Sequence, residues 1–183
     1  FRSEICMLDD IKEVLFSRED IEGLIGKLGV QINRDYQNGN LLLVSVLKGS
    51  VVFMADLMRA ITIPCRIDFM AVSSYGSGTT SGAVKIIKDL DVDLEGYDVL
   101  IVEDILDSGK TLSYILELLK GRNPKSLKIC TLFDKPDRRQ VKLVPDYKGA
   151  EVPDEFIVGY GLDCNEKYRN LPFVAVLKPH IYS

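Results

Sequence analysis

Histidine, paired cysteines and long apolar runs are scarce or missing in this sequence of 183 residues. The single histidine is His180, so chemistry that depends on a histidine base is disfavoured. No apolar stretch approaches the ~18 residues that cross a bilayer, and no signal peptide is expected at the N-terminus. The cysteines are Cys6, Cys65, Cys130 and Cys164. Because they form no Cys-x-x-Cys pair, a zinc site or a disulfide framework is disfavoured, and a reduced, cytoplasmic setting is expected.

An excess of basic residues is also absent, since the formal net charge is −4. This balance disfavours a nucleic-acid coat or a protein that binds membrane surfaces. Apolar residues make up 46% of the chain and charged residues 27%, which is typical of a folded globular protein. The length favours a single domain with one substantial core.

Apolar segments of strand length alternate with segments of helical periodicity. Apolar residues at helical spacing predict a helix from about residue 18 to 37, and further helices at 51–61 and 112–119. Strands are predicted at 41–46, 67–72, 99–102 and 127–133, with later candidates at 156–158 and 173–177. Strands that are almost continuously apolar indicate an α/β fold, with a central parallel sheet covered by helices on both faces.

Residues 73–82 differ from their surroundings, because they read Ser-Ser-Tyr-Gly-Ser-Gly-Thr-Thr-Ser-Gly. They offer little to bury and much backbone freedom, so a loop is predicted. Long loops in compact domains often act as lids over a site. An ordinary surface excursion is the alternative.

The most informative segment is residues 99–111, Val-Leu-Ile-Val-Glu-Asp-Ile-Leu-Asp-Ser-Gly-Lys-Thr. An apolar strand ends in two adjacent acids, Glu103 and Asp104, and a short turn leads into a helix. In an open parallel sheet, ligands bind beyond the carboxyl ends of the strands. A helix that starts there directs unpaired backbone N–H groups at the ligand, so the turn predicts a phosphate site. It is not a P-loop, because Asp104 stands where that motif requires glycine, and no Gly-x-Gly-x-x-Gly opens a helix.

The two acids require a partner other than phosphate. Carboxylates accept hydrogen bonds from vicinal ribose hydroxyls, and they also attract Mg²⁺, a hard cation that prefers oxygen. The segment therefore indicates a site for a ribose 5-phosphate. Capping of the strand and of the next helix is the alternative for each residue taken singly.

This segment resembles the phosphoribosyl pyrophosphate motif of type I phosphoribosyltransferases. Nearly the whole chain resembles the hypoxanthine-guanine (6-oxopurine) branch of that family. The resemblance extends to Leu47-Lys48-Gly49, Ser74-Tyr75, Phe133-Asp134-Lys135, the run 156–163 and the run 165–169. It implies an α/β core at about 37–150, with a small C-terminal hood at about 151–183 that takes in part of the N-terminus.

The resemblance also implies a role for each matching residue. Asp107 would be the general base near N7 of the purine, Glu103 and Asp104 would hold the ribose hydroxyls, and Ser74 and Tyr75 would belong to a flexible lid. The 5-phosphate would lie on Asp107, Ser108, Gly109, Lys110 and Thr111, and the pyrophosphate on Lys48, Gly49 and Arg169. The purine would contact Lys135, Phe156, Ile157 and Asp163, and Mg²⁺ would be held near Asp163, Glu103 and Asp104. Lys110 has a simple alternative role as a surface charge at the start of a helix.

The reaction implied is the transfer of the phosphoribosyl group from phosphoribosyl pyrophosphate to hypoxanthine or guanine, with xanthine left open. The products would be pyrophosphate and IMP or GMP, in purine salvage, by a cytoplasmic homodimer or homotetramer that engages neither nucleic acid nor membrane. Adenine is disfavoured, because its amino group cannot accept a hydrogen bond from the Lys135 ammonium. A regulator that keeps this fold and binds nucleic acid is disfavoured by the negative charge and by the presence of Asp107.

Overall fold

The computed structural model describes residues 7–75 and 83–183. Its first long helix is α2 (Arg18–Asp35), which begins with a capping box: the Ser17 hydroxyl accepts from the Asp20 backbone amide, and the Asp20 carboxylate accepts from the Ser17 backbone amide. The apolar residues at helical spacing form the buried face of α2, as the sequence predicts. In the described part of the chain, no helix is long and apolar enough to cross a membrane.

The main sheet has six strands in the order β4-β3-β2-β5-β6-β7. Their bounds are β2 (Leu41–Leu47), β3 (Cys65–Tyr75), β4 (Ala83–Lys88), β5 (Asp98–Leu106), β6 (Ser126–Asp134) and β7 (Tyr147–Glu151). All neighbouring pairs are parallel except β3 and β4, which are antiparallel. The predicted α/β fold is confirmed, with the correction that the sheet is mixed rather than wholly parallel.

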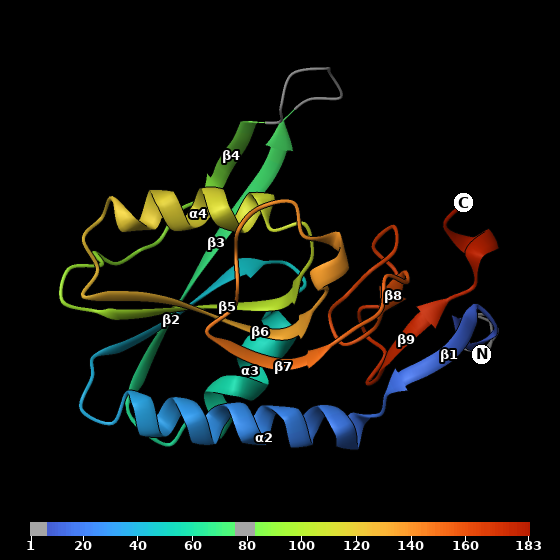
Figure 1. Cartoon of the computed structure of the whole chain (residues 1–183), viewed down its shortest axis with the longest axis horizontal. Coiled ribbons are helices and arrows are strands. Elements are labelled where there is room, and N and C mark those ends of the chain that lie inside the picture. Colours follow the sequence, from blue (N-terminus) through green and yellow to red (C-terminus); the bar gives the residue numbers. More distant parts are fainter. Residues whose placement is uncertain (1–6, 76–82) are drawn as a thin grey trace.

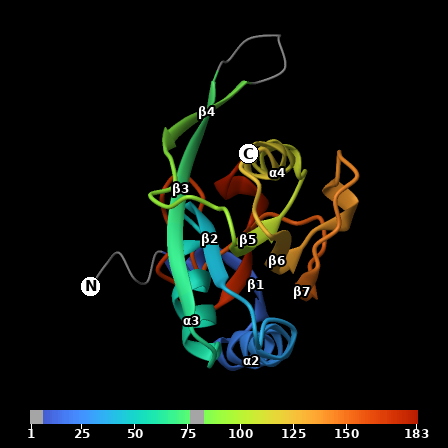
Figure 2. The same cartoon turned by 90° about the vertical axis from the view of Figure 1, so that its left-hand side faces the viewer.

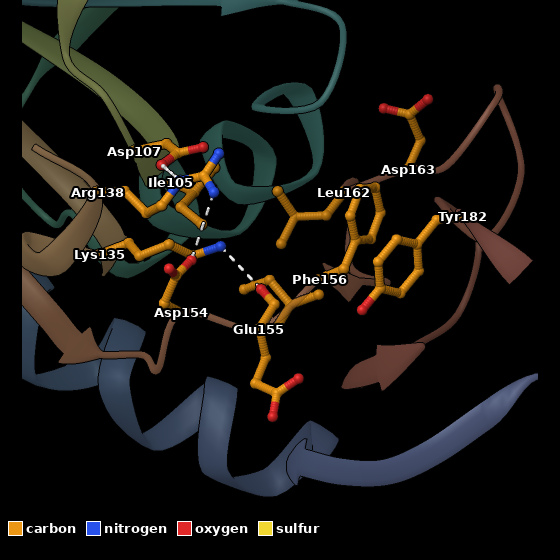
Figure 3. A pocket seen from close by; sticks show the side chains of 11 residues that line it. Ile105, Asp107, Lys135, Arg138, Asp154, Glu155, Phe156, Leu162, Asp163 and Tyr182 are labelled. Atoms are coloured by element: carbon orange, nitrogen blue, oxygen red, sulfur yellow. Dashed lines mark hydrogen bonds and ion pairs between the residues drawn. The ribbon is translucent and has the colours of Figure 1, made fainter. Parts of the chain in front are cut away.

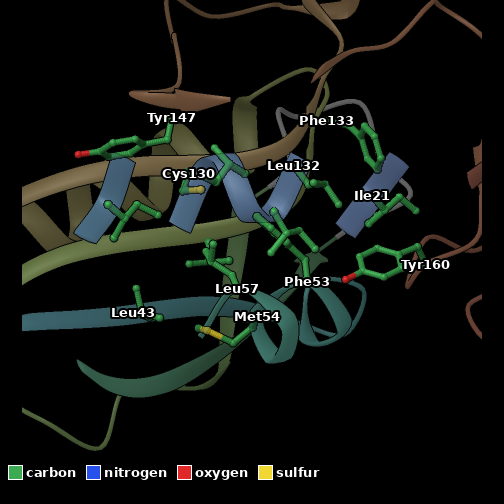
Figure 4. Packing of buried hydrophobic residues seen from close by; sticks show 14 of the residues in the cluster. Ile21, Leu43, Phe53, Met54, Leu57, Cys130, Leu132, Phe133, Tyr147 and Tyr160 are labelled. Atoms are coloured by element: carbon green, nitrogen blue, oxygen red, sulfur yellow. The ribbon is translucent and has the colours of Figure 1, made fainter. Parts of the chain in front are cut away.

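Helices cover both faces of this sheet (Figure 1). Helices α2 and α3 (Val51–Ala60) lie on one face, and α4 (Lys110–Lys120) lies on the other. Each face has its own apolar cluster. The larger one joins α2 and α3 to the sheet through residues such as Ile21, Phe53 and Phe133 (Figure 4). Cys130 is buried in this cluster, whereas Cys65 is half-buried at its edge.

The order of the strands creates a switch point between β2 and β5. The chain leaves β2 through α3 toward β3 on one side, and it leaves β5 through α4 toward β6 on the other. Ligands of open α/β sheets bind at such a point, beyond the carboxyl ends of the two strands. The predicted pyrophosphate turn follows β2, and the predicted phosphate turn follows β5.

A second, small sheet packs beside that end of the main sheet (Figure 1). It consists of β1 (Ile11–Phe16), β9 (Val174–Leu177) and β8 (Ile157–Val158), all antiparallel. The short 3₁₀ helix η1 (Pro136–Arg138) lies between β6 and β7, and a second one, η2 (Pro179–Ile181), follows β9.

Two sequence predictions need correction here. Ser73, Ser74 and Tyr75 end β3 as strand residues rather than opening a loop, because their backbones pair with β4, for example Tyr75 with Ala83. The rest of the predicted loop lies outside the described residues. Figure 2 shows the β3–β4 pair extending beyond the helical layers. In addition, β5 continues past the two acids to Leu106, because that part of the strand still pairs with β6.

Candidate active site

The crevice between β2 and β5 is lined by the turn after β2 and by the two acids of β5. The peptide bond Leu47–Lys48 in this turn is cis. Gly49 lies so close to Asp104 that an added Cβ would overlap the carboxylate. β2 pairs with β5 only as far as Val102, so Glu103 and Asp104 lie just beyond the paired region, at the crevice.

The two acids are poorly compensated by the protein. Burial raises the pKa of Glu103 well above its usual value, and the charge of Asp104 raises it further. Burial also raises the pKa of Asp104 to about 6, although the Ile105 backbone amide donates to its carboxylate at 2.8 Å. Glu103 Oε1 is buried without a hydrogen-bond partner. Such oxygens are suited to accept from hydroxyl groups of a ligand or to contact a cation.

The turn after β5 has the geometry expected of a phosphate site. Gly109 adopts φ +80°, which glycine tolerates best, and α4 begins at the next residue. A cavity of about 160 Å³ lies against this turn. Its walls include Glu103, Asp107, Ser108, Gly109 and Thr111, whereas Lys110 is exposed and is not among the lining residues.

Arg139 supports the same turn from outside. Its guanidinium donates to the backbone carbonyls of Asp107 and Leu106 at 3.0 and 3.3 Å, and it pairs with the buried Asp134. The Gln140 backbone amide donates to the Ser108 carbonyl at 3.0 Å. Because these carbonyls accept hydrogen bonds from Arg139 and Gln140, the backbone amides of the turn remain available to a ligand.

A larger cavity of about 360 Å³ opens beside the turn, between the main sheet and the small sheet (Figure 3). It is lined by Ile105, Asp107, Lys135, Arg138, Asp154, Glu155, Phe156, Ile157, Leu162, Asp163 and Tyr182. It therefore brings together an acid, a lysine and an aromatic ring, which are the groups needed to bind a heteroaromatic base by its edge and its face.

Lys135 is the main donor in this cavity. Its side chain is buried rather than solvated, with 7% exposure of the residue, and its Nζ donates to the Glu155 carbonyl at 2.9 Å. An ammonium has three hydrogens, so donors remain for a ligand. Phe156 is 37% exposed at the cavity wall, so it is not simply a core residue.

Asp107 links the two cavities, since it lines both of them. Its carboxylate lies 3.5 Å from Arg138 Nε, and Arg138 also lies 3.6 Å from Asp154. Oδ1 of Asp107 has no hydrogen-bond partner. Among the described residues, the buried side-chain atoms that lack such a partner belong to Glu103, Asp107, Arg169 and, elsewhere, Tyr36. Three of these four residues belong to the predicted site, which therefore holds polar atoms that are available to a ligand.

Arg169 lies on the crevice side of the small-sheet region. It donates to the Gly161 carbonyl at 2.7 Å and pairs with Asp163 at 3.0 Å and Glu166 at 3.2 Å. Lys48 pairs with the same Glu166 at 3.1 Å. Arg169 is not among the residues that line the 360 Å³ cavity, called the base cavity below. Its charge nevertheless acts on Asp104, because it lowers the pKa of that carboxyl.

The structure thus brings most of the predicted residues into one continuous region, and it adds others that the sequence analysis missed. The side chains of Ser74 and Tyr75 are outside what the structure describes. Arg138, Asp154, Leu162 and Tyr182 were missed, although the charged run 134–139 was a usable signal for Arg138. The described residues contain no group of three or more His, Cys, Asp or Glu side chains that could hold a metal ion.

Comparison with known proteins agrees with this geometry. The phosphoribosyl transferase domain family matches residues 14–165. The hypoxanthine-guanine phosphoribosyltransferase of Streptococcus thermophilus is 55% identical over 175 residues, which cover 95% of this chain and 97% of that protein. A solved hypoxanthine phosphoribosyltransferase from Staphylococcus aureus has a TM-score of 0.94 and 52% identity, with 97% of each chain covered.

A longer protein is also similar. The bifunctional protein TilS/HprT of Listeria monocytogenes is 52% identical over 178 residues, which cover 97% of this chain. The chain spans 28% of the length of that relative.

Proposed function

The chain belongs to the hypoxanthine-guanine phosphoribosyltransferases, enzymes of purine salvage, and we propose that it joins hypoxanthine or guanine to phosphoribosyl pyrophosphate at the site described above. The observation that carries this proposal is the shared position of Asp107. It lines the phosphate turn and the base cavity, where the base and the ribose carbon must meet.

The phosphoribosyl pyrophosphate would lie along the carboxyl ends of β5 and β2. Backbone amides and hydroxyls from Asp107 through Ser108, Gly109, Lys110 and Thr111 bind the 5-phosphate. Glu103 and Asp104 accept from the ribose hydroxyls, which supply the donors that their buried oxygens lack. The backbone of Lys48 and Gly49, with the Arg169 guanidinium, binds the pyrophosphate.

The base would enter the cavity between the two sheets. Lys135 donates to the exocyclic O6, Phe156 stacks on the face of the purine, and the Ile157 backbone and Asp163 meet its remaining edge. As N9 attacks C1′ of the ribose and the bond to pyrophosphate breaks, Asp107 accepts the proton that leaves the base at N7. The small sheet, with residues 151–183, would serve as a hood over the base, and Ser74 and Tyr75 would belong to a lid that excludes water.

The family generally uses Mg²⁺, and the donors at this site fit that cation. Buried carboxylate oxygens without partners are hard ligands, and Mg²⁺ is commonly held by one or two carboxylates together with substrate phosphates. Glu103, Asp104 and Asp163 would hold it. The ion would supply positive charge to the departing pyrophosphate.

The oligomer and the location are also proposals. We propose a homodimer or homotetramer that works in the cytoplasm, a setting with which the free thiols of Cys65, Cys130 and Cys164 agree.

The test is a transfer assay with phosphoribosyl pyrophosphate, Mg²⁺ and one of hypoxanthine, guanine or xanthine. Equal amounts of nucleotide and pyrophosphate are expected with the first two bases, and chelation of the metal should stop the reaction. The rate with xanthine assigns the base preference. Folded protein that forms no nucleotide with any of the three would refute the proposal.

A further inference from the structure

An aromatic stack at the wall of the base cavity joins Phe156 to Tyr182, a residue that has no role in the mechanism above. The rings of Phe156 and Tyr182 have centroids 4.6 Å apart and planes inclined by 19°. Both residues line the cavity. In Figure 3, Tyr182 lies beyond Phe156 as seen from Lys135 and Asp107. Tyr182 therefore covers the face of Phe156 that is turned away from Lys135 and Asp107.

The segment that carries Tyr182 is fixed from several directions. The Leu177 backbone amide donates to the Phe156 carbonyl at 2.9 Å, so the two segments are joined at their backbones. The Lys178 backbone amide donates to the Asp10 carbonyl at 2.9 Å, and its Nζ donates to the Asp9 carbonyl at 2.5 Å. Ile181 packs against the apolar cluster of the small sheet. The backbone that leads to Tyr182 is thus held by contacts with Phe156, Asp9 and Asp10.

Phe156 needs a support. It is 37% exposed, so the core does not fix the whole of its ring, and a free side chain loses rotamer freedom when a ligand stacks on it. A second ring that is packed on its outer face removes part of that cost before the ligand arrives. Tyr182 itself is 38% exposed, so the contribution of this contact to overall stability is small.

We propose that Tyr182 is a positioning residue for the base, which holds the Phe156 ring in the orientation that stacks on the purine. This inference deepens the proposed function and rests on it. It predicts an effect on the base alone, because the phosphate turn and the crevice contain neither ring.

The experiment compares Tyr182→Ala and Tyr182→Leu with Tyr182→Phe in steady-state assays that vary hypoxanthine and phosphoribosyl pyrophosphate separately. The contact energy of an aromatic pair corresponds to a factor of about two to ten in a binding constant. The KM for hypoxanthine should therefore rise by that factor in Y182A and Y182L. The KM for phosphoribosyl pyrophosphate and kcat should stay within about twofold. Y182F keeps the ring and should retain the low KM. Tyr114→Ala is the matched control, because Tyr114 is a 43% exposed tyrosine on α4 that lines neither of the two cavities described above.

An unchanged KM for hypoxanthine in Y182A and Y182L would overturn the inference. An equal rise in the KM values for hypoxanthine and phosphoribosyl pyrophosphate would also overturn it, because Tyr182 would then support the fold in general. The same rise in Y182F would overturn it as well, because that variant keeps the ring contact with Phe156. Wild-type protein that forms no IMP would instead refute the proposed function, and this inference with it.

Discussion

Replacement of Asp104 by asparagine should make the ligand-free protein more stable, because the site keeps a buried negative charge that the Ile105 amide and Arg169 compensate only in part. The pKa of Asp104 is raised from its usual 3.8 to about 6, chiefly by burial. Each pKa unit corresponds to ~1.4 kcal/mol, so the whole rise is worth about 3 kcal/mol. Asp104 keeps some contact with solvent, so a gain of about 1–3 kcal/mol is expected in D104N, or roughly 3–10 °C in melting temperature. Asparagine can still accept the hydrogen bond from the Ile105 amide.

The pH dependence of this gain follows from linkage. A carboxyl with a raised pKa in the folded state binds its proton more tightly when the protein is folded, so wild-type stability falls as the pH rises. The gain from D104N is therefore complete above about pH 7, shrinks between pH 6 and 4, and vanishes below the usual pKa of 3.8. The Asp104 charge also raises the pKa of Glu103, so its removal should bring the Glu103 pKa closer to its usual value.

The assay is denaturation of ligand-free protein in the presence of a chelator, at pH 7.5 and at pH 4. Asp93→Asn is the matched control, because Asp93 is exposed and also accepts a backbone hydrogen bond, from Glu95. A D104N variant that is less stable than wild type at pH 7.5, or whose gain does not shrink at pH 4, would refute the reasoning. The same variant should bind phosphoribosyl pyrophosphate more weakly.

Two further predictions concern the turns on either side of the crevice. Asp107→Ala should slow nucleotide formation by at least about a hundredfold, since a general base contributes that much, and should change phosphoribosyl pyrophosphate binding little. Single-turnover rates measure the first effect and calorimetry the second. Unchanged turnover would show that Asp107 is not the general base. Gly161→Ala should lower the melting temperature and raise the KM for phosphoribosyl pyrophosphate, because Gly161 has φ +96° and an added Cβ would overlap the Gly49 carbonyl. A G161A variant with wild-type values for both would contradict this.

Local pattern was sufficient to predict the part of the site that lies in one stretch of chain. Residues 99–111 fold as one β-turn-α unit that contains the apolar strand, the two acids and the glycine turn. Because these parts are neighbours in the sequence, they are also neighbours in the site. The helices are predictable because their buried apolar residues recur at helical spacing. β2 and the first half of β5 are predictable because each is an almost continuous apolar run that the structure buries.

The strands that were missed lack those signals. β4 (Ala83–Lys88) and β7 (Tyr147–Glu151) are edge strands that contain lysine and have mostly half-buried or exposed residues. β1 (Ile11–Phe16) belongs to a sheet whose other strands come from the far end of the chain. Their formation depends on pairing between distant segments, which periodicity within one segment does not report.

Contacts across the chain also explain the missed site residues. Tyr182 meets Phe156 because β8 and β9 pair and bring the two segments together. The burial of Lys135 depends on the Glu155 carbonyl, which lies 20 residues away. Without the family resemblance, a lysine at a strand end is read as solvated.

The central claim is that this cavity selects 6-oxopurines through Lys135 and joins them to the ribose beside Asp107. The most direct test is the ratio of kcat/KM for hypoxanthine to that for adenine, in wild type and in Lys135→Met. A site that donates to O6 should reject adenine by at least about a thousandfold. Loss of a hydrogen bond from a charged donor should lower kcat/KM for hypoxanthine by roughly 10- to 150-fold in K135M. The ratio of kcat/KM for hypoxanthine to that for adenine should fall by a similar factor. A wild-type protein that uses adenine and hypoxanthine equally, or a K135M variant with an unchanged ratio, would contradict the account.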